Sequence, residues 1–358
     1  MRQIKYLSPT SIATWLKDPT EYYLNYRAED RPARFPQTQP MSIGSAFDAY
    51  VKSYLHAMLF GEGSDPRFSI EALFETQVEE HNRDWAWGHG QYVFDCYKNS
   101  GALADLGALL QKSVTPPRFE VSVEGPIGPT GLRLLGKPDL HFTILSAEGR
   151  QNVIVYDWKV SGYCSKSNTS PKPGYIMCRD GWRGDFAKHS RSHLQSHPSV
   201  IVESMAGCRE LNYSKNILFE DIFEDWARQL AVYSWVLGVP VGEEPIVGID
   251  LLACDGSKRD APEGRPLLRV AEYRGRISAA YQTALLQIAN NIWACHTELV
   301  DGRPYIFRNM SQDESVEYCR MLDTQAAALR GNGTEEDAIF AELSRGTSYG
   351  APYTPSIR

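Results

Sequence analysis

Two short segments, GKPDL at residues 136–140 and VIVYDWK at 153–159, decide how this chain folds. The second has the apolar, β-branched composition of a strand. Because side chains alternate between the faces of a strand, Asp157 and Lys159 point the same way and Trp158 points oppositely, into packing. Asp139 lies 18 positions before Asp157, which suits a neighbouring strand joined by a hairpin over 146–149. Two carboxylates converging beside an ammonium group can hold a hard divalent cation and steady a water molecule that attacks phosphate.

Further segments carry recognisable patterns. Residues 225–233, DWARQLAVY, have helical spacing, and Gln229 and Tyr233 lie four positions apart on one face of that helix. Near the start, LSPTS at 7–11 precedes Asp18-Pro19 and YYLNY at 22–26, and GSAFDAY follows at 44–50. Ser8 is a suitable N-cap with Pro9 at the first helical position, and Pro19 should break or restart that helix.

In this order the segments resemble the PD-(D/E)XK nuclease superfamily, in particular its RecB-like exonuclease branch. That branch carries an acid in a G-x-x-D-L strand, then a D-x-K strand, then a Q-x-x-x-Y helix. The N-terminal segments resemble its opening helix, its C-P-x-x-(Y/F) turn and its G-x-x-x-H helix. The resemblance covers roughly residues 1–55, 118–160 and 225–300. It implies an α/β fold with a restriction-endonuclease-like core, in which helices flank a mixed central β-sheet, here with helical additions and a long insertion.

The resemblance also implies the site. The catalytic residues would be Asp139, Asp157, Lys159, Gln229 and Tyr233. Lys159 would orient or activate the attacking water and offset charge on the phosphoryl oxygens. The glutamine and the tyrosine would orient Lys159 or hold the DNA backbone. The competing interpretation treats each as an ordinary turn cap, strand end or packing residue.

The predicted metal is Mg²⁺ or Mn²⁺, because both prefer oxygen ligands. The predicted ligands are Asp48, Asp139, Asp157 and Trp158. Asp48 stands where many relatives carry a histidine, which leaves the number and preference of metals open, and it could instead be a polar residue on an outer helix face. Glu120 and Glu124 alternate with apolar residues. One of them could reach the metal through water, but the pattern favours a solvated face.

The formal net charge of −7 argues against a polyanionic partner, yet charge is unevenly distributed along the chain. Between residues 159 and 200, seven Lys or Arg face two Asp, a local charge of +5. We therefore predict DNA contacts from Arg179, Arg183, Lys188 and Arg191. Arg228, next to Gln229 in the predicted helix, is a further candidate for a phosphate contact. Histidines at 189, 193 and 197 have the spacing of a zinc site, although a basic helix that contacts phosphate fits their surroundings better.

Several classes of protein are disfavoured. No apolar run approaches the ~18–20 residues of a membrane span, no signal core opens the chain, and the seven cysteines lack a paired framework, all of which favours the cytoplasm. No phosphate loop of a helicase motor is present. Relatives with an iron–sulfur cluster place a cysteine before the N-terminal proline and three more near the C-terminus. Here Asp18 precedes Pro19 and only Cys319 follows Cys295, so we expect no cluster.

We expect a single nuclease domain over 1–358. Its predicted parts are a helical region at 1–117, a catalytic core at 118–160 and 216–300, a basic insertion at 161–215 and C-terminal helices at 301–358. The predicted strands are 118–124, 131–143, 152–160, 246–254 and 266–274. The predicted helices are 42–60, 69–112 with an interruption at 85–90, 220–237, 277–298 and two shorter ones at the C-terminus.

The expected function is that of a metal-dependent DNA nuclease. It would act on DNA ends as an exonuclease, in the DNA processing of phages or mobile elements or in repair and recombination. Its partners would be linear or single-stranded DNA and, as candidates, a recombinase, helicase or single-strand-binding protein. Two alternatives stay open. One is a catalytically silent subunit that binds nucleic acid or protein. The other is a sequence-specific endonuclease whose recognition element would have to lie in 161–215. Polarity, strand preference and oligomeric state do not follow from the sequence.

Overall fold

The computed structural model describes residues 2–30, 36–146, 148–166, 171, 175–179, 181–187, 218–260, 264–297, 299–300 and 303–329. Its helices are α1 (Pro9–Lys17), α2 (Pro19–Tyr22), the π-helical η1 (Tyr23–Arg27), α3 (Gln39–Phe60), η2 (Pro66–Phe68), α4 (Ile70–Gln77), η3 (Glu80–Asn82), α5 (Arg83–Ser100), α6 (Ala102–Leu110), α7 (Phe219–Ile222), α8 (Glu224–Val236), α9 (Ala279–Thr297) and α10 (Gln312–Leu329). Its strands are β1 (Arg118–Phe119), β2 (Val123–Ile127), β3 (Leu132–Gly136), β4 (Leu140–Leu145), β5 (Gln151–Ser161), β6 (Tyr175–Arg179), β7 (Trp182–Ala187), β8 (Ile246–Asp260), β9 (Arg265–Arg276), β10 (Leu299–Val300) and β11 (Arg303–Pro304).

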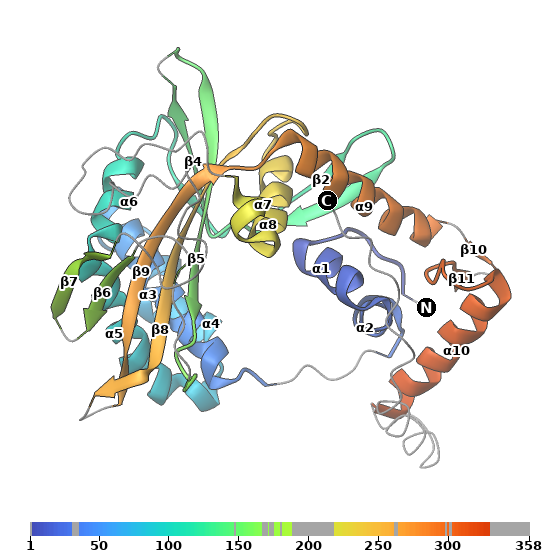
Figure 1. Cartoon of the computed structure of the whole chain (residues 1–358), viewed down its shortest axis with the longest axis horizontal. Coiled ribbons are helices and arrows are strands. Elements are labelled where there is room, and N and C mark those ends of the chain that lie inside the picture. The colour runs from blue at the N-terminus through green and yellow to red at the C-terminus, as the bar shows by residue number, and fades with distance from the viewer. Residues whose placement is uncertain are drawn as a thin grey trace.

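A seven-stranded mixed sheet forms the centre of the fold, in the order β1-β4-β5-β8-β9-β6-β7 (Figure 1). β5 pairs in parallel with β8, and the other neighbouring strands that pair do so antiparallel. The predicted hairpin between β4 and β5 is confirmed by their antiparallel register, which opposes Leu140 to Tyr156. The chain must cross over between parallel strands, and α7 and α8 lie within that crossover.

Helices cover both faces of the sheet, which is why β5 is apolar on both sides. Tyr156 and Trp158 pack into the core formed with α3, α5 and α6, whereas Val155 packs into the core formed with α1, α8 and α9. Burying one such large apolar side chain contributes about 1.5–3 kcal/mol. This alternation confirms the predicted parity of the strand and carries Asp157 and Lys159 toward α8.

Two predicted strands are each divided in the structure. Glu120 has a φ of +51°, a left-handed conformation that ends β1 and turns the chain into β2. The predicted strand 131–143 is β3 and β4, which separate at residues 137–139. β3 leaves the main sheet to pair with β2, and this hairpin packs against α8. Both breaks lie next to Asp139, so the irregular backbone helps to shape the site.

The interruption predicted at 85–90 is wrong, because α5 runs through it from Arg83 to Ser100. A glycine is useful here for packing, since a Cβ placed on Gly90 would lie 2.5 Å from the Cβ of Ala46 on α3. The helical region breaks instead before Arg83 and at Gly101, whose φ is +95°. The predicted cap of Ser8 and the restart at Pro19 are confirmed, with Asp18 capping α2.

Part of the predicted insertion is regular structure. β6 and β7 form an antiparallel pair that extends the sheet beyond β9, where the sequence lacked clear strand periodicity. Lys188, Arg191 and the histidines at 189, 193 and 197 lie outside the described residues, as does the second predicted C-terminal helix. Within the described part of the chain, no helix combines the length and apolarity that a membrane crossing requires.

Candidate metal centre

The carboxyl groups of Asp139 and Asp157 lie next to each other where β4 begins beside β5. Asp139 directly precedes β4, and the β4–β5 register places it opposite Asp157. The two side chains are close enough to share a hydrogen bond. The Asp157 carboxylate also accepts hydrogen bonds from the Trp158 backbone N–H at 2.8 Å and from the Lys159 Nζ at 2.7 Å. The side chain of Asp157 is only 1% exposed. We call Asp139, Asp157 and Lys159 the metal centre.

Helix α8 holds the ammonium group of this centre. Lys159 Nζ donates to Gln229 Oε1 at 3.1 Å, and Gln229 Nε2 donates to the Tyr233 hydroxyl at 3.0 Å. Gly136 permits α8 to approach, because a Cβ at this position would lie 2.6 Å from Val236 Cγ2. The five predicted catalytic residues are thus brought together in one continuous chain of contacts.

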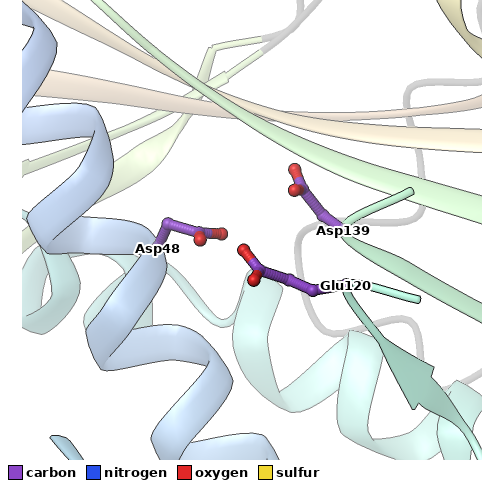
Figure 2. A group of neighbouring side chains, drawn as sticks. All are labelled: Asp48, Glu120 and Asp139. Carbon is purple, nitrogen blue, oxygen red and sulfur yellow. The ribbon is translucent and has the colours of Figure 1, made fainter. Parts of the chain in front are cut away.

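A second set of acids adjoins the metal centre. Asp48 from α3, Glu120 from the kink after β1 and Asp139 each present a carboxylate oxygen, all within 4.8 Å of one another. Figure 2 shows the Asp48 side chain reaching toward Glu120 and Asp139 from the opposite side. We call this group the acid triad. The Nζ of Lys52, one helical turn after Asp48, bonds to all three carboxylates: to Asp48 at very short range, to Glu120 at 2.6 Å and to Asp139 at 3.3 Å.

Comparison with known proteins agrees with this geometry. Residues 6–173 match the family model of the PD-(D/E)XK nuclease superfamily. The chain accordingly has the fold class predicted for it, a mixed β-sheet flanked by helices, and this sheet has seven strands. The matched segment contains α3, Glu120 and both aspartates of the metal centre, and ends before α8. No curated protein matches the sequence. One solved structure, titled as the crystal structure of SSO0001, aligns over 79% of this chain and 90% of its own chain at 14% sequence identity, with a TM-score of 0.22.

The two aspartates of the metal centre differ in their electrostatics. Burial and the negative charge of Asp139 raise the pKa of Asp157 well above its usual value, and Lys159 opposes this only in part. Burial also disfavours ionisation of Asp139. Here, however, the charge of Lys52, a hydrogen bond from Asp157 and the charge of Lys159 outweigh it and lower the pKa of Asp139 to about 2. Asp157 therefore holds its proton more strongly than Asp139 does, as happens when two carboxylates share a site.

Burial and neighbouring charges also shift the pKa values of groups in and around the acid triad. Burial raises the pKa of Asp48 to about 7 despite the opposing charge of Lys52. The pKa of Lys52 is raised, because its burial is outweighed by the charges of Asp139, Asp48 and Glu120. The donor set of the metal centre, two adjacent carboxylates whose mutual repulsion a cation would relieve, fits a hard divalent ion.

The other predicted site residues are placed as follows. Trp158 is buried on the opposite face of β5, where its indole Nε1 donates to the Tyr97 hydroxyl at 3.3 Å. Arg228 is nearly buried and bonds to Asp225 and Glu224 of its own helix. Arg183 is exposed on β7, its Nε donating to the Ser100 carbonyl, and Arg179 lies on β6.

Sequence reasoning missed one residue and undervalued another. The motif order does not point to Lys52, although its place four residues after Asp48 is a signal, because that spacing puts both on one helix face. Glu120 was assigned to a solvated face from the alternation of its neighbours. Its positive φ breaks that alternation and turns the side chain toward α3. Glu124 does behave as expected, pairing with Arg133 at the surface.

Proposed function

We propose that this protein is a divalent-metal-dependent DNA nuclease. The observation that carries the proposal is the meeting of Asp139 and Asp157 beside the Lys159 ammonium, which Gln229 holds in turn. The carboxylates of Asp139 and Asp157 would hold Mg²⁺ or Mn²⁺, which supplies Lewis-acid activation of water and phosphate. The sequence also predicts Asp48 and Trp158 as ligands, but the Lys52 ammonium group already binds Asp48 and the Trp158 side chain lies on the opposite face of β5.

Lys159 is the candidate for electrostatic catalysis. Its Nζ lies 2.7 Å from Asp157 and 3.1 Å from Gln229, so it is oriented before substrate arrives. A donor fixed in this way can face a phosphoryl oxygen where negative charge develops, without reorganising during the reaction. The hydrogen bond between Gln229 and Tyr233 restricts the glutamine to one rotamer, which makes α8 the support for Lys159.

A groove beside the acid triad is suited to a nucleic-acid strand. It has a volume of about 430 Å³ and is lined by His56, Phe60, Arg67, Phe68, Pro117, Arg118, Phe119, Glu120 and Val121. Phe60 is 41% exposed, and the His56 and Phe68 rings stack at a centroid distance of 4.1 Å. Aromatic faces receive bases and arginines attract phosphates. Glu120 belongs to both groups, so a strand in the groove would lead directly to the acids.

We further propose that DNA ends are the substrate, that Arg179, Arg183, Lys188, Arg191 and Arg228 contribute to DNA binding, and that the chain acts in the cytoplasm in phage, mobile-element or repair DNA processing. The DNA-end substrate and Arg228 rest on the RecB-like motif order, and the other four contacts rest on the +5 stretch of the sequence.

One observation favours a different function. Lys52 already neutralises part of the acid triad, as it would in a silent subunit that binds nucleic acid without cutting it. Such a subunit would retain the groove but would have no use for a fixed Lys159.

Cleavage of defined DNA decides between these functions. Linear duplex and single-stranded DNA, labelled at the 5′ or the 3′ end, and covalently closed circles would be incubated with Mg²⁺, Mn²⁺ or EDTA. We expect metal-dependent loss of the linear substrates and survival of the circles, abolished by Asp157→Asn. Glu124→Gln, which removes a nearby acid outside the triad, is the matched control and should cut normally. Cleaved circles would indicate an endonuclease, and binding of DNA without any cleavage would establish the silent alternative.

A further inference from the structure

Lys52 differs from the other lysines around the site in being completely buried. Its side chain is 0% exposed, on the face of α3 that packs toward the sheet. Within the described residues, its hydrogen bonds go to the three carboxylates of the acid triad. A cation therefore already lies at the place where these acids converge, and the protein supplies it.

This ammonium group has no favourable place to retreat to. Its neighbours on α3 include Phe47, Val51 and Leu55, which belong to the apolar core beneath the sheet. Moving the charge away from the triad would leave it unpaired among these side chains, and an uncompensated buried charge costs several kcal/mol. An arriving metal ion would have to meet that cost in order to displace Lys52.

The charges of the site leave room for one divalent ion. When ionised, the acid triad and Asp157 carry four negative charges, and the ammonium groups of the fully buried Lys52 and the partly exposed Lys159 carry two positive ones. The remaining formal charge of −2 is neutralised by a single divalent cation. Lys137 also pairs with Glu120, but from the rim, where its side chain is 53% exposed and water screens it.

We propose that Lys52 is a permanent cation that takes the place of a second metal ion and confines the single divalent ion to Asp139 and Asp157. The proposal rests on the proposed function. In it, Asp48 and Glu120 act as positioning residues that hold Lys52. Lys52 in turn orients Asp139 through their hydrogen bond, while the Asp139 carboxyl group also interacts with Asp157. Asp48 thereby binds an ammonium group where relatives place a metal-binding histidine.

The number of Mn²⁺ ions bound without DNA tests this directly, by titration calorimetry and by electron paramagnetic resonance of free Mn²⁺. We expect the wild type to bind one ion. Lys52→Met removes the charge and keeps the length, so three carboxylates are freed and the stoichiometry should rise to two. The melting temperature of this variant should also rise more on adding Mn²⁺ than that of the wild type. Lys137→Met, which removes a rim lysine from the same glutamate, is the matched control and should still bind one ion.

Two bound ions in the wild type would overturn the proposal and leave the nuclease function standing, and this result needs no variant to fold. A stoichiometry of one in both Lys52→Met and the smaller Lys52→Gln, each folded by circular dichroism, would overturn it equally. If the wild type binds no Mn²⁺ at all, the proposed function fails together with the inference.

Discussion

The part of the chain that the structure describes contains two groups of acids that exceed their cations, and we propose a metal ion for only one of them. The metal centre and the acid triad lie at the strand ends, where the side chains of Asp139, Glu120 and Asp48 are each partly exposed. The second group lies beneath α5 and α6, on the face of the sheet that carries Trp158. There Asp250 of β8 lies between Trp158 and Glu272 of the neighbouring strands, and Arg274 pairs with both acids. We call Asp250, Glu272, Arg274, Tyr97 and Tyr156 the buried network.

The two groups differ in how their oxygens are used. Asp250 accepts hydrogen bonds from the hydroxyls of Tyr97 at 2.5 Å and Tyr156 at 2.7 Å, and from Arg274 at 2.9 Å. Asp250 is completely buried, and burial raises the pKa of Glu272 well above its usual value. An excess of acids therefore does not define a metal site. Access from solvent distinguishes the two groups, because Asp48, Glu120 and Asp139 are each partly exposed whereas Asp250 is completely buried, and the predictions below test that distinction.

Asp157→Asn should have the largest effect on function. Removing one of two ligands forfeits several kcal/mol of charge stabilisation, or about 10³-fold or more in the rate of DNA cleavage. The cleavage rate of labelled linear DNA measures this, with Glu124→Gln as control. A variant that retains the wild-type rate would show that the metal centre is misassigned.

Arg274→Met should have the largest effect on stability. It leaves Asp250 and Glu272 buried without their cation, which typically costs about 3–5 kcal/mol. Urea denaturation monitored by tryptophan fluorescence measures the change. The Mn²⁺ affinity of the folded variant should stay close to that of the wild type. A clear gain in Mn²⁺ affinity or stoichiometry in the folded Arg274→Met protein would mean that the buried network can also hold a metal ion.

Lys159→Ala should separate catalysis from metal binding. Its loss removes one prearranged donor, which costs on the order of 10²–10³ in rate. Mn²⁺ affinity should change little, because the carboxylates of Asp139 and Asp157 remain. Calorimetry beside cleavage assays compares the two quantities. Cleavage within a few-fold of wild type would remove Lys159 from the mechanism.

The two aspartates should affect the stability of the metal-free protein in opposite directions. The pKa of Asp157 is raised, so its contribution to stability is present below the pKa of the unfolded chain and is lost as pH rises through the folded value. Asp157→Asn should therefore stabilise the protein at pH 8 by about 1–3 kcal/mol and give no gain at pH 4.

The pKa of Asp139 is lowered to about 2, so its contribution is present above pH ~4 and is lost as pH falls toward 2. Asp139→Asn should destabilise the protein at pH 8. Thermal melts in EDTA across pH give the sign of each effect, and equal signs would contradict the charge assignment.

Features of the fold and the candidate site could be predicted from the sequence when they depend on local patterns along the chain. Asp139, Asp157, Lys159, Gln229 and Tyr233 follow from the alternation of a strand and the turn of a helix, and the structure brings them together. Glu120 depends on a single positive φ, which alternation cannot reveal. Lys52 depends on how deeply α3 sits against the sheet, and the continuity of α5 depends on the contact between Gly90 and Ala46. These are tertiary properties, and the sequence pattern does not contain them.

The groove should show the smallest effect. Phe60→Ala removes an exposed ring on which a base could stack, and this should weaken binding of single-stranded DNA by about 1 kcal/mol, or about fivefold. Tyr54→Ala, an equally exposed aromatic residue on the same helix but outside the groove, should have no effect. Fluorescence anisotropy with a catalytically inactive background measures both. Equal affinities for the two variants would place the strand elsewhere.

The position of the metal ion tests the central claim most directly. Crystals grown with Mn²⁺ would be measured at the manganese absorption edge, where anomalous scattering locates the ion independently of any variant. The account predicts one peak between the carboxylates of Asp139 and Asp157, with the Lys52 ammonium still inside the acid triad. A peak at the centre of the triad with Lys52 displaced, or a peak beside Asp250 and Glu272, would contradict it.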